Sequence, residues 1–142
     1  MFRAPPLQAI PPEIAAVSDY AAYAERRLDP AAWAYLDGAA ADEISQGWNR
    51  RAFDQLALLP RVLNSVSGGH CRTRLLGRDL PLPILLAPIA WQKLFHPDGE
   101  LATAYAAAAL DVGMILSTLA SASIEDVAAA GQQGGTGPRW FQ

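Results

Sequence analysis

Two short apolar runs on either side of a helical segment constrain the fold of this chain more than any other feature. Residues 84–87 read ILLA and residues 114–117 read MILS. Such continuous runs are typical of strands buried on both faces of a parallel sheet. The alanine-rich residues 98–110 between them predict a helix that Gly113 ends. A capping-box-like start at Ser123 predicts a helix to Ala130, which Gly131 ends, and a third strand follows at 139–142.

The order strand, helix, strand, helix, strand predicts parallel, right-handed crossover units, and therefore an α/β fold. A helical N-terminal part followed by a hairpin and then βαβαβ fits the N-terminal part of a (β/α)8 TIM barrel. An open doubly wound sheet is the alternative. It would need a glycine-rich phosphate loop after the first strand, where residues 87–92 instead read APIAWQ. Three strands leave poor edges, so we expect an incomplete barrel.

The first half of the chain predicts mostly helices. Residues 1–18 hold four prolines within the first twelve positions and are expected to form an irregular arm. Ser18 is a plausible N-cap for a helix over 19–28, and Asp29 with Pro30 starts a helix that Gly38 ends. A helix over 42–56 would carry one apolar stripe, formed by Ile44, Trp48, Ala52 and Leu56.

A short extended segment at 58–63 and a small hairpin over 72–82 are expected next. Pro60 favours an edge position for the first, and the turn of the hairpin is expected at Gly77 and Arg78. We take residues 19–142 together as one N-terminal portion of a larger domain, truncated after its third barrel strand.

Composition excludes several functions for this 142-residue chain. The net charge is −3 with interspersed signs, so nucleic acid is not an expected partner. One cysteine, Cys71, excludes an internal disulfide, and two histidines, His70 and His96, are too far apart for a zinc site. No apolar run approaches the roughly 20 residues of a transmembrane helix, and no signal peptide is visible, so we expect a cytoplasmic protein.

Ligands of parallel α/β folds bind beyond the carboxyl ends of the strands. Those ends carry residues 87–90, then Ser117 and Thr118, then Gln142. Backbone amides and carbonyls, hydroxyls and one carboxamide suit the edge of a flat heteroaromatic ring. By position alone, however, Ser117 could simply cap a strand and Gln142 could be a surface residue.

Several segments together resemble the FMN-dependent α-hydroxy-acid oxidases and dehydrogenases, in family order from about residue 19 to 142. They are YLDGAAADE at 35–43, NRRAF at 49–53, LPRVL at 59–63, APIA at 87–90, HPDGE at 96–100, SIE at 123–125 and WFQ at 140–142. Other FMN barrels, such as isomerases or inosinate dehydrogenase relatives, are disfavoured by the first and fifth of these segments.

The resemblance implies an FMN barrel that oxidises an L-2-hydroxy acid to a 2-oxo acid. It implies that the backbone of Pro88, Ile89 and Ala90 lies along the flavin, that Ser117 contacts the ring, and that Gln142 hydrogen-bonds its polar edge. Tyr35 matches a tyrosine that contacts the substrate carboxylate; without the resemblance it would be a half-buried helix aromatic.

The resemblance places the catalytic base, the carboxylate-clamping Arg, a flavin-side Lys and the phosphate anchor outside these 142 residues, so no catalytic residue is assigned. His96 belongs to the HPDGE turn and starts the helix at Asp98, and Lys93 is expected to be structural or exposed. Ala39 and Ala41 replace the usual glycines, and a positive φ at either alanine would cost about 1 kcal/mol.

Two functional readings follow. The chain is either part of a catalytic FMN oxidoreductase, or a non-catalytic remnant or half-barrel that needs a complementary C-terminal half. If the chain is part of an oxidoreductase, we expect a small 2-hydroxy acid as its substrate. We also expect the full-length enzyme to form a homo-oligomer. These residues do not identify which 2-hydroxy acid is the substrate (lactate, glycolate or mandelate). They do not identify the electron acceptor either.

Overall fold

A computed structural model describes residues 7–132, 135 and 137–142. The chain divides into two compact units, Met1–Gly69 and His70–Gln142, and each is described by itself. The expected arm falls partly on residues 1–6, which lie outside the described residues. Its boundary at residue 18 stays a prediction.

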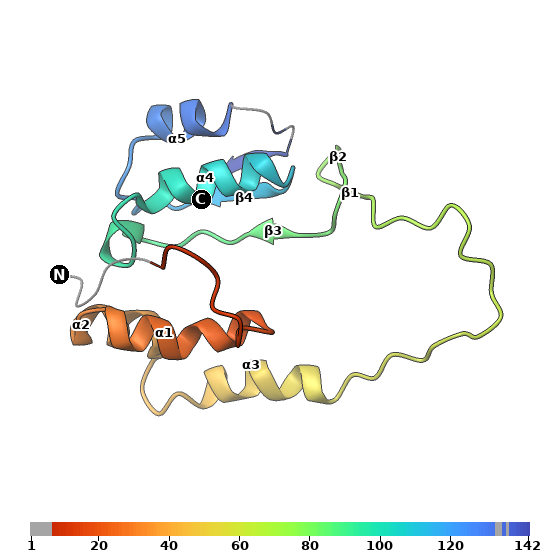
Figure 1. Cartoon of the computed structure of the whole chain (residues 1–142), viewed down its shortest axis with the longest axis horizontal. Helices are drawn as coiled ribbons and strands as arrows, with labels where there is room; N and C mark the ends of the chain where they lie inside the picture. Colours follow the sequence, from red (N-terminus) through yellow and green to blue (C-terminus); the bar gives the residue numbers. More distant parts are fainter. Residues whose placement is uncertain (1–6, 133–134, 136) are drawn as a thin grey trace. The chain divides into compact units, whose positions relative to one another are not determined.

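The first unit is helical, as predicted. A 3-10 turn, η1 (Val17–Asp19), leads into α1 (Tyr20–Arg27), and then come α2 (Pro30–Asp37) and α3 (Ile44–Asp54) (Figure 1). The expected stripe is not buried in this structure, because Ile44 and Trp48 on α3 are 54% and 63% exposed. The helix is shorter than the predicted 42–56, so Leu56, which is 77% exposed, lies beyond its end. An apolar stripe left in water marks a surface built to pack against something else.

The helix starts show which capping predictions were right. The Asp29 carboxylate accepts a hydrogen bond from the backbone N–H of Ala31 at 3.0 Å, and Pro30 occupies the first turn of α2, as expected. The Ser18 N-cap is wrong, because Ser18 lies inside η1. Asp19 occupies the N-cap position of α1, but its side chain makes no bond to that helix. Its carboxylate accepts instead from the preceding backbone N–H groups of Ala16 at 2.8 Å and Ala15 at 2.9 Å.

The segment expected to be extended at 58–63 forms no strand in the structure. Leu58 is 98% exposed and Leu59 is 90% exposed. The strand prediction was wrong there because these residues find no neighbouring strand within the described chain to pair with, and an isolated strand leaves its backbone groups to water.

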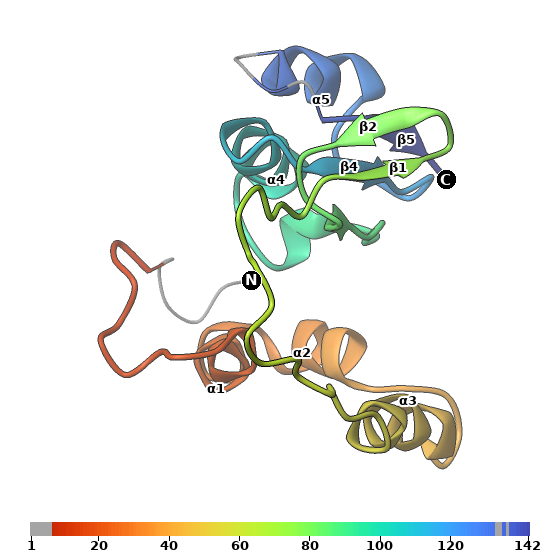
Figure 2. The same cartoon turned by 90° about the vertical axis from the view of Figure 1, so that its right-hand side faces the viewer.

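The second unit opens with the predicted hairpin. Strands β1 (Thr73–Leu75) and β2 (Arg78–Leu80) pair antiparallel, with Leu75 opposite Arg78 (Figure 2). The turn is therefore Leu76 and Gly77, one residue earlier than expected. Their φ values of 47° and 77° are those of a type I′ turn, whose twist matches that of the flanking strands.

A parallel three-stranded sheet in the order β3-β4-β5 forms the rest of the second unit. Strand β3 is Leu85–Leu86, β4 is Gly113–Leu116 and β5 is Arg139–Phe141. The 3-10 turn η2 (Gln92–Leu94) and helix α4 (Gly99–Ala109) connect the first pair, and α5 (Ile124–Gly131) connects the second. The predicted βαβαβ order and its parallel pairing are confirmed. No closed barrel is present in the described residues, which agrees with the expected incomplete barrel.

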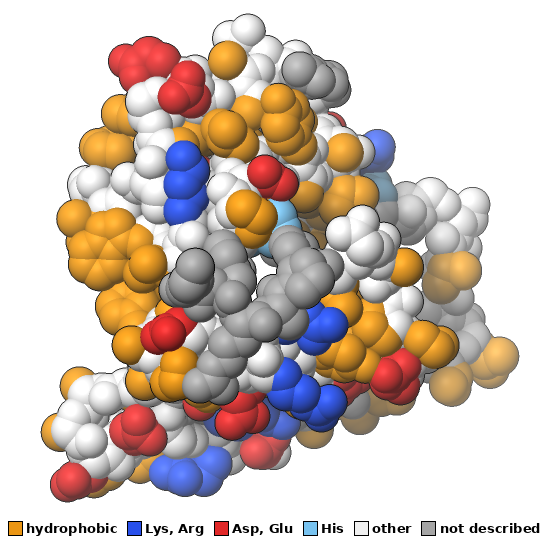
Figure 3. All heavy atoms as spheres, turned by 60° about the vertical axis from the view of Figure 1, so that its left-hand side comes forward, with side chains coloured by type: hydrophobic (Ala, Val, Ile, Leu, Met, Phe, Trp, Pro, Cys, Tyr) orange, Lys and Arg blue, Asp and Glu red, His pale blue; other side chains and the backbone are white. Residues whose placement is uncertain are grey.

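The core of the second unit lies between the sheet and its two helices. Its buried members are Ala104 and Ala107 from α4, Met114 and Leu116 from β4, and Val127 and Ala130 from α5. In Figure 1, α4 runs alongside β4. Many large apolar side chains stay on the surface, as the orange spheres of Figure 3 show for one face.

Gly113 does not end α4, as had been expected, because it is the first residue of β4. Asp111 makes the left-handed turn after the helix, with a φ of 53°. Gly113 has another role. A Cβ at Gly113 would clash with Leu85 Cδ2 and would lie 3.1 Å from Pro138 Cγ. Glycine therefore lets the segments that carry Leu85 and Pro138 pack closely against β4.

Candidate functional site

The carboxyl ends of the three parallel strands bring five of the six predicted site residues, all except Tyr35, into one rim. Leu116 of β4 lies opposite Phe141 of β5, so Ser117 and Gln142 are the next residues in register. The backbone N–H of Gln142 donates to the Leu116 carbonyl at 2.9 Å, which continues the ladder past the end of β5. The rim also includes the segment from Pro88 to Ala90, which follows β3 on the other side of β4.

Ser117 is buried, with 5% of its surface exposed, and its orientation is fixed by its own turn. Its Oγ accepts a hydrogen bond from the Leu119 N–H at 3.1 Å, and its carbonyl accepts from Ala120 at 3.1 Å. Because Oγ acts as the acceptor in that bond, the hydroxyl hydrogen is available to donate to a ligand.

The segment after β3 is tied to the Ser117 turn. The backbone N–H of Trp91 donates to the Leu119 carbonyl at 2.9 Å, and Trp91 has a left-handed backbone with a φ of 49°. Pro88 and Ala90 are partly buried, and Ile89 is 45% exposed. The chain between β3 and η2 therefore presents its backbone and one apolar side chain at the rim.

Tyr35 lies in the first unit, on α2, and is 51% exposed. The residue after α2, Gly38, donates to the Ala34 carbonyl at 3.0 Å and ends the helix as expected. Ala41, in the same motif as Tyr35, has a φ of 50°, whereas Ala39 is not among the residues with positive φ. The suspected strain is therefore present at Ala41.

Glu100 was not predicted as a site residue, yet its side chain joins the two rim loops. It is fully buried, and its Oε1 accepts from Ser121 N–H at 2.8 Å and from Gln92 N–H at 3.2 Å. A signal was present: Glu100 shares the i, i+4, i+7 face of α4 with the buried Ala104 and Ala107. A carboxylate on an apolar face is expected to have partners.

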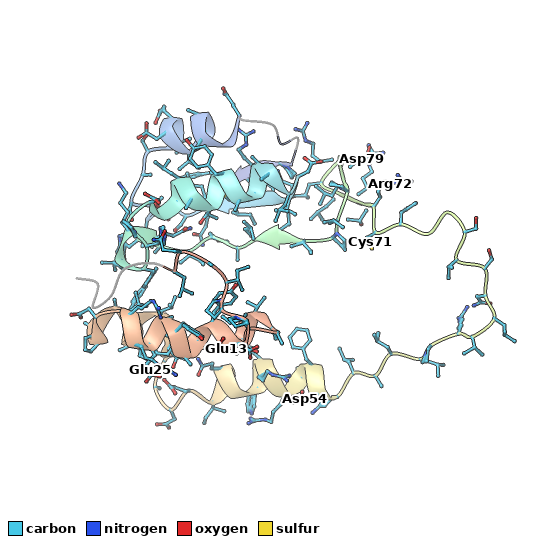
Figure 4. The ribbon with its side chains drawn as sticks, in the orientation of Figure 1. Glu13, Glu25, Asp54, Cys71, Arg72 and Asp79 are labelled. Atoms are coloured by element: carbon cyan, nitrogen blue, oxygen red, sulfur yellow. The ribbon has the colours of Figure 1, made fainter. Side chains whose placement is uncertain are left out.

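His96 and Lys93 have the roles expected of them. His96 Nδ1 accepts from the Asp98 N–H at 3.2 Å, and its carbonyl accepts from Gly99 at 3.0 Å, so His96 shapes the turn that starts α4. Lys93 is exposed. Cys71, in the segment before β1, is an exposed free thiol (Figure 4). Among the residues that the structure describes, no group of His, Cys, Asp and Glu could hold a metal ion.

The clear pKa shifts belong to residues of the first unit. The backbone N–H groups of Ala16 and Ala15 lower the pKa of Asp19, which they stabilise as an anion. The Tyr23 hydroxyl donates to Glu13, which lowers the pKa of Glu13 and raises that of Tyr23 (Glu13 is labelled in Figure 4). These groups stabilise the start of the helical unit.

Two hollows lie on the second unit, and both are apolar rather than part of the rim. The larger, of about 110 Å³, is lined by Met114, Leu116, Val127, Trp140 and their neighbours between the sheet and α5. The other lies between α4, β4 and the start of β5. Neither hollow is lined by Ser117 or Gln142.

The rim chemistry fits one part of a ligand. Ser117 offers a buried hydroxyl, Gln142 a carboxamide, and the chain from Pro88 to Ala90 a backbone edge beside an apolar side chain. Such donors and acceptors suit the edge of a flat heteroaromatic ring. None of these groups is cationic, and none is a nucleophile paired with a base.

A membrane-spanning helix is not found among the described elements, since none is both long and apolar enough. The longest helices, α3 and α4, have 11 residues each, against the roughly 20 needed to cross a bilayer.

Curated proteins that resemble this chain are oxidases of small hydroxy acids. An L-lactate oxidase of Alicycliphilus denitrificans is 45% identical over 96% of this chain and 36% of its own length. Glycolate oxidase 1 of Zea mays is 43% identical over 92% of this chain and 34% of its own. The chain thus spans about a third of the length of these relatives.

Solved structures that resemble this chain are also oxidases, named for lactate or mandelate. A lactate oxidase of Pediococcus acidilactici has a TM-score of 0.82 at 34% identity, covering 92% of this chain and 35% of the other. A mandelate oxidase mutant that holds a C4a-OH-FMN adduct has a TM-score of 0.79 at 35% identity, covering 87% of this chain and 36% of the other. The model of the FMN-dependent dehydrogenase family matches residues 24–142, and the chain belongs to that family.

Proposed function

We propose that this chain contributes the first part of the flavin site of an enzyme that oxidises an L-2-hydroxy acid to a 2-oxo acid. FMN is the cofactor of the family. The observation that carries the proposal is the placement of Ser117 and Gln142 at adjacent positions on neighbouring strands, next to the segment from Pro88 to Ala90.

Bound FMN supplies the two-electron acceptor that the oxidation needs. The residues of this chain bind and orient its ring. The buried Ser117 hydroxyl donates to the ring, the Gln142 carboxamide pairs with its polar edge, and the backbone from Pro88 to Ala90 lies along it. Fixed donors of this kind stabilise negative charge on a reduced ring without reorganising.

Tyr35 is proposed to contact the carboxylate of a small 2-hydroxy acid. Its position on the short helix α2, set by the Asp29 cap and Pro30, suits a hydroxyl held at the end of a rigid element. The curated relatives are named for L-lactate and glycolate, and both are acids of this class.

A second function is favoured by the exposed apolar surface: a half-barrel that requires a complementary C-terminal half. Trp48 on α3 is 63% exposed, Leu56 just after α3 is 77% exposed, and Phe141 on β5 is 58% exposed. A covering half would bury these side chains. Under this proposal the 142 residues alone do not oxidise 2-hydroxy acids, because the base and the carboxylate clamp that the family resemblance implies lie outside them.

Two measurements test these proposals. The first is FMN bound per purified chain, from visible absorbance after excess flavin is removed; stoichiometric binding supports a usable half-site. The second is a chimera in which this chain replaces the matching third of the Alicycliphilus denitrificans L-lactate oxidase. Flavin loading and L-lactate oxidation by the chimera support the proposed roles, whereas a folded chimera without flavin contradicts them. Reduction of added FMN by lactate with the chain alone would contradict the half-barrel reading.

A cytoplasmic location and a homo-oligomeric full-length enzyme belong to the same proposal. The first is the expectation from the sequence, in which no signal peptide and no transmembrane run is visible, and the second comes from the family resemblance. Size-exclusion chromatography of the chimera with light scattering tests the second.

A further inference from the structure

We infer that Glu100 is a positioning residue that fixes the spacing of the two loops carrying the proposed flavin contacts. The inference rests on the proposed function for its meaning, but the hydrogen bonds behind it do not depend on that function. One loop runs from β3 to η2 and carries Pro88 to Ala90. The other runs from Ser117 to Ser123 between β4 and α5.

Glu100 bridges these loops with a single oxygen. Its Oε1 accepts from Gln92 N–H at 3.2 Å, two residues after Ala90, and from Ser121 N–H at 2.8 Å, four residues after Ser117. The side chain is fully buried, so water does not compete for these bonds. Bonds from N–H groups to a carboxylate are stronger than bonds between neutral groups.

Two neighbouring bonds support the same bridge. Trp91 N–H donates to the Leu119 carbonyl at 2.9 Å, and Lys93 N–H donates to Ser121 Oγ at 3.2 Å. Three consecutive amides, at positions 91 to 93, are therefore bonded either to the Ser117 loop or to the carboxylate that holds it. Glu100 is the only one of these acceptors that belongs to neither loop, and it sits on the first turn of α4.

The backbone before Glu100 is shaped to bring it there. Gly99 has a φ of 50°, and a Cβ on it would lie 2.8 Å from Lys93 Cγ and 3.2 Å from Lys93 N. The loop thus passes directly over Gly99, which lets the Glu100 side chain reach the Gln92 amide.

The other oxygen, Oε2, is buried and has no hydrogen-bond partner among the described residues. A Glu100→Gln variant keeps the carbonyl oxygen that accepts from both loops and changes only the side without a partner. A Glu100→Ala variant removes the bridge. The two variants together separate the loss of the bridge from the loss of charge.

The test uses amide hydrogen exchange of the 142-residue chain, followed by NMR. In Glu100→Ala we expect the amides of Gln92 and Ser121 to exchange about tenfold faster or more, because each loses a bond to a buried carboxylate. The amides of Val127 and Met114, which donate to the Ser123 and Pro138 carbonyls, should change much less. In Glu100→Gln, the exchange rates of all four amides should stay within about threefold of the wild-type rates. The matched control is Glu125→Ala, the same substitution at an exposed glutamate in the first turn of α5. It should leave the exchange rates of the four amides unchanged.

Several outcomes would overturn the inference: no protection of Gln92 and Ser121 in wild type, no change in Glu100→Ala, or uniform acceleration at all four amides in both Glu100 variants. The last would show a merely structural carboxylate. FMN titration of the same samples gives the functional reading, and Glu100→Ala should bind FMN more weakly than Glu100→Gln. If wild type binds no FMN, the flavin half-site fails, and the exchange data still decide the role of Glu100.

Discussion

The Gln142 N–H donates to the Leu116 carbonyl at 2.9 Å and thereby holds Gln142 beside Ser117. This bond is the last rung of the β4–β5 ladder, and the two proposed flavin contacts sit immediately beyond it. Their spacing is set by strand register, which is specified by the buried residues of the core and not by the polar residues themselves. The site therefore depends on the fold of the second unit.

Ser117→Ala should weaken FMN binding of the chimera about three- to tenfold, because one neutral hydrogen bond contributes about 1 kcal/mol. Flavin fluorescence titration measures this. The variant also removes the acceptor for the Leu119 N–H, so it should lower stability by about 1 kcal/mol.

Ser123→Ala is the matched control for that loss. The Ser123 Oγ accepts from Asp126 N–H at 3.1 Å, the same length as the Ser117 bond, but it caps α5 and is not one of the proposed flavin contacts. Ser123→Ala should lower the stability by about as much as Ser117→Ala does, and it should leave the FMN affinity unchanged. Equal weakening of flavin binding by both substitutions would count against a flavin contact by Ser117.

Tyr35→Phe should raise the KM of the chimera for L-lactate by about tenfold or more, since a bond to a charged carboxylate is worth about 1.5–3 kcal/mol. A smaller change in kcat is expected, because the contact is present in both the ground state and the transition state. Steady-state kinetics measures both constants. Tyr20→Phe, at an exposed tyrosine of α1, is the control, and a KM effect as large as that of Tyr35→Phe would refute substrate contact by Tyr35.

Local residue chemistry predicted the elements of this fold well. The apolar runs predicted β3 and β4, Asp29 with Pro30 predicted the start of α2, and Ser123 predicted the start of α5; the Ser123 Oγ accepts from Asp126 N–H as a cap should. Each of these signals lies within a few residues of the feature it specifies.

What could not be predicted depends on residues far apart in the chain. The Glu100 bridge reaches Ser121, 21 positions later, and HPDGE was taken only as a helix start. Gly113 was assigned to a helix end because the crowding by Leu85 and Pro138 that requires glycine arises only when the strands pair.

Ala41→Gly should stabilise the first unit by about 0.5–1 kcal/mol, because Ala41 has a φ of 50° and glycine adopts that conformation without the steric cost. The gain is limited by the extra freedom of glycine in the unfolded chain. Ala39→Gly is the matched control two residues away. Ala39 is not among the residues with positive φ, so this change should destabilise by about 0.5 kcal/mol. Urea unfolding followed by circular dichroism measures both, and shifts of the same sign would contradict the assignment of strain to Ala41.

Gly99→Ala should destabilise the second unit by about 2 kcal/mol or more, because it combines a positive φ with a close approach. The φ is 50°, and the added Cβ would meet Lys93 Cγ at 2.8 Å and the Lys93 backbone nitrogen at 3.2 Å. Lys93 Cγ belongs to a flexible side chain and can move aside, but the nitrogen belongs to η2 and is held by its bond to Ser121.

Gly77→Ala separates the two costs. Gly77 has a φ of 77° with nothing within 4 Å of its Cβ position, so its substitution should cost only the conformational term of about 1 kcal/mol. Thermal unfolding of both variants measures the difference. If Gly99→Ala cost no more than Gly77→Ala, the loop over Gly99 would be free to shift, and the geometry that brings Glu100 to Gln92 would be looser than the structure shows. A larger cost at Gly99 means that this turn is held rigidly where the two rim loops meet.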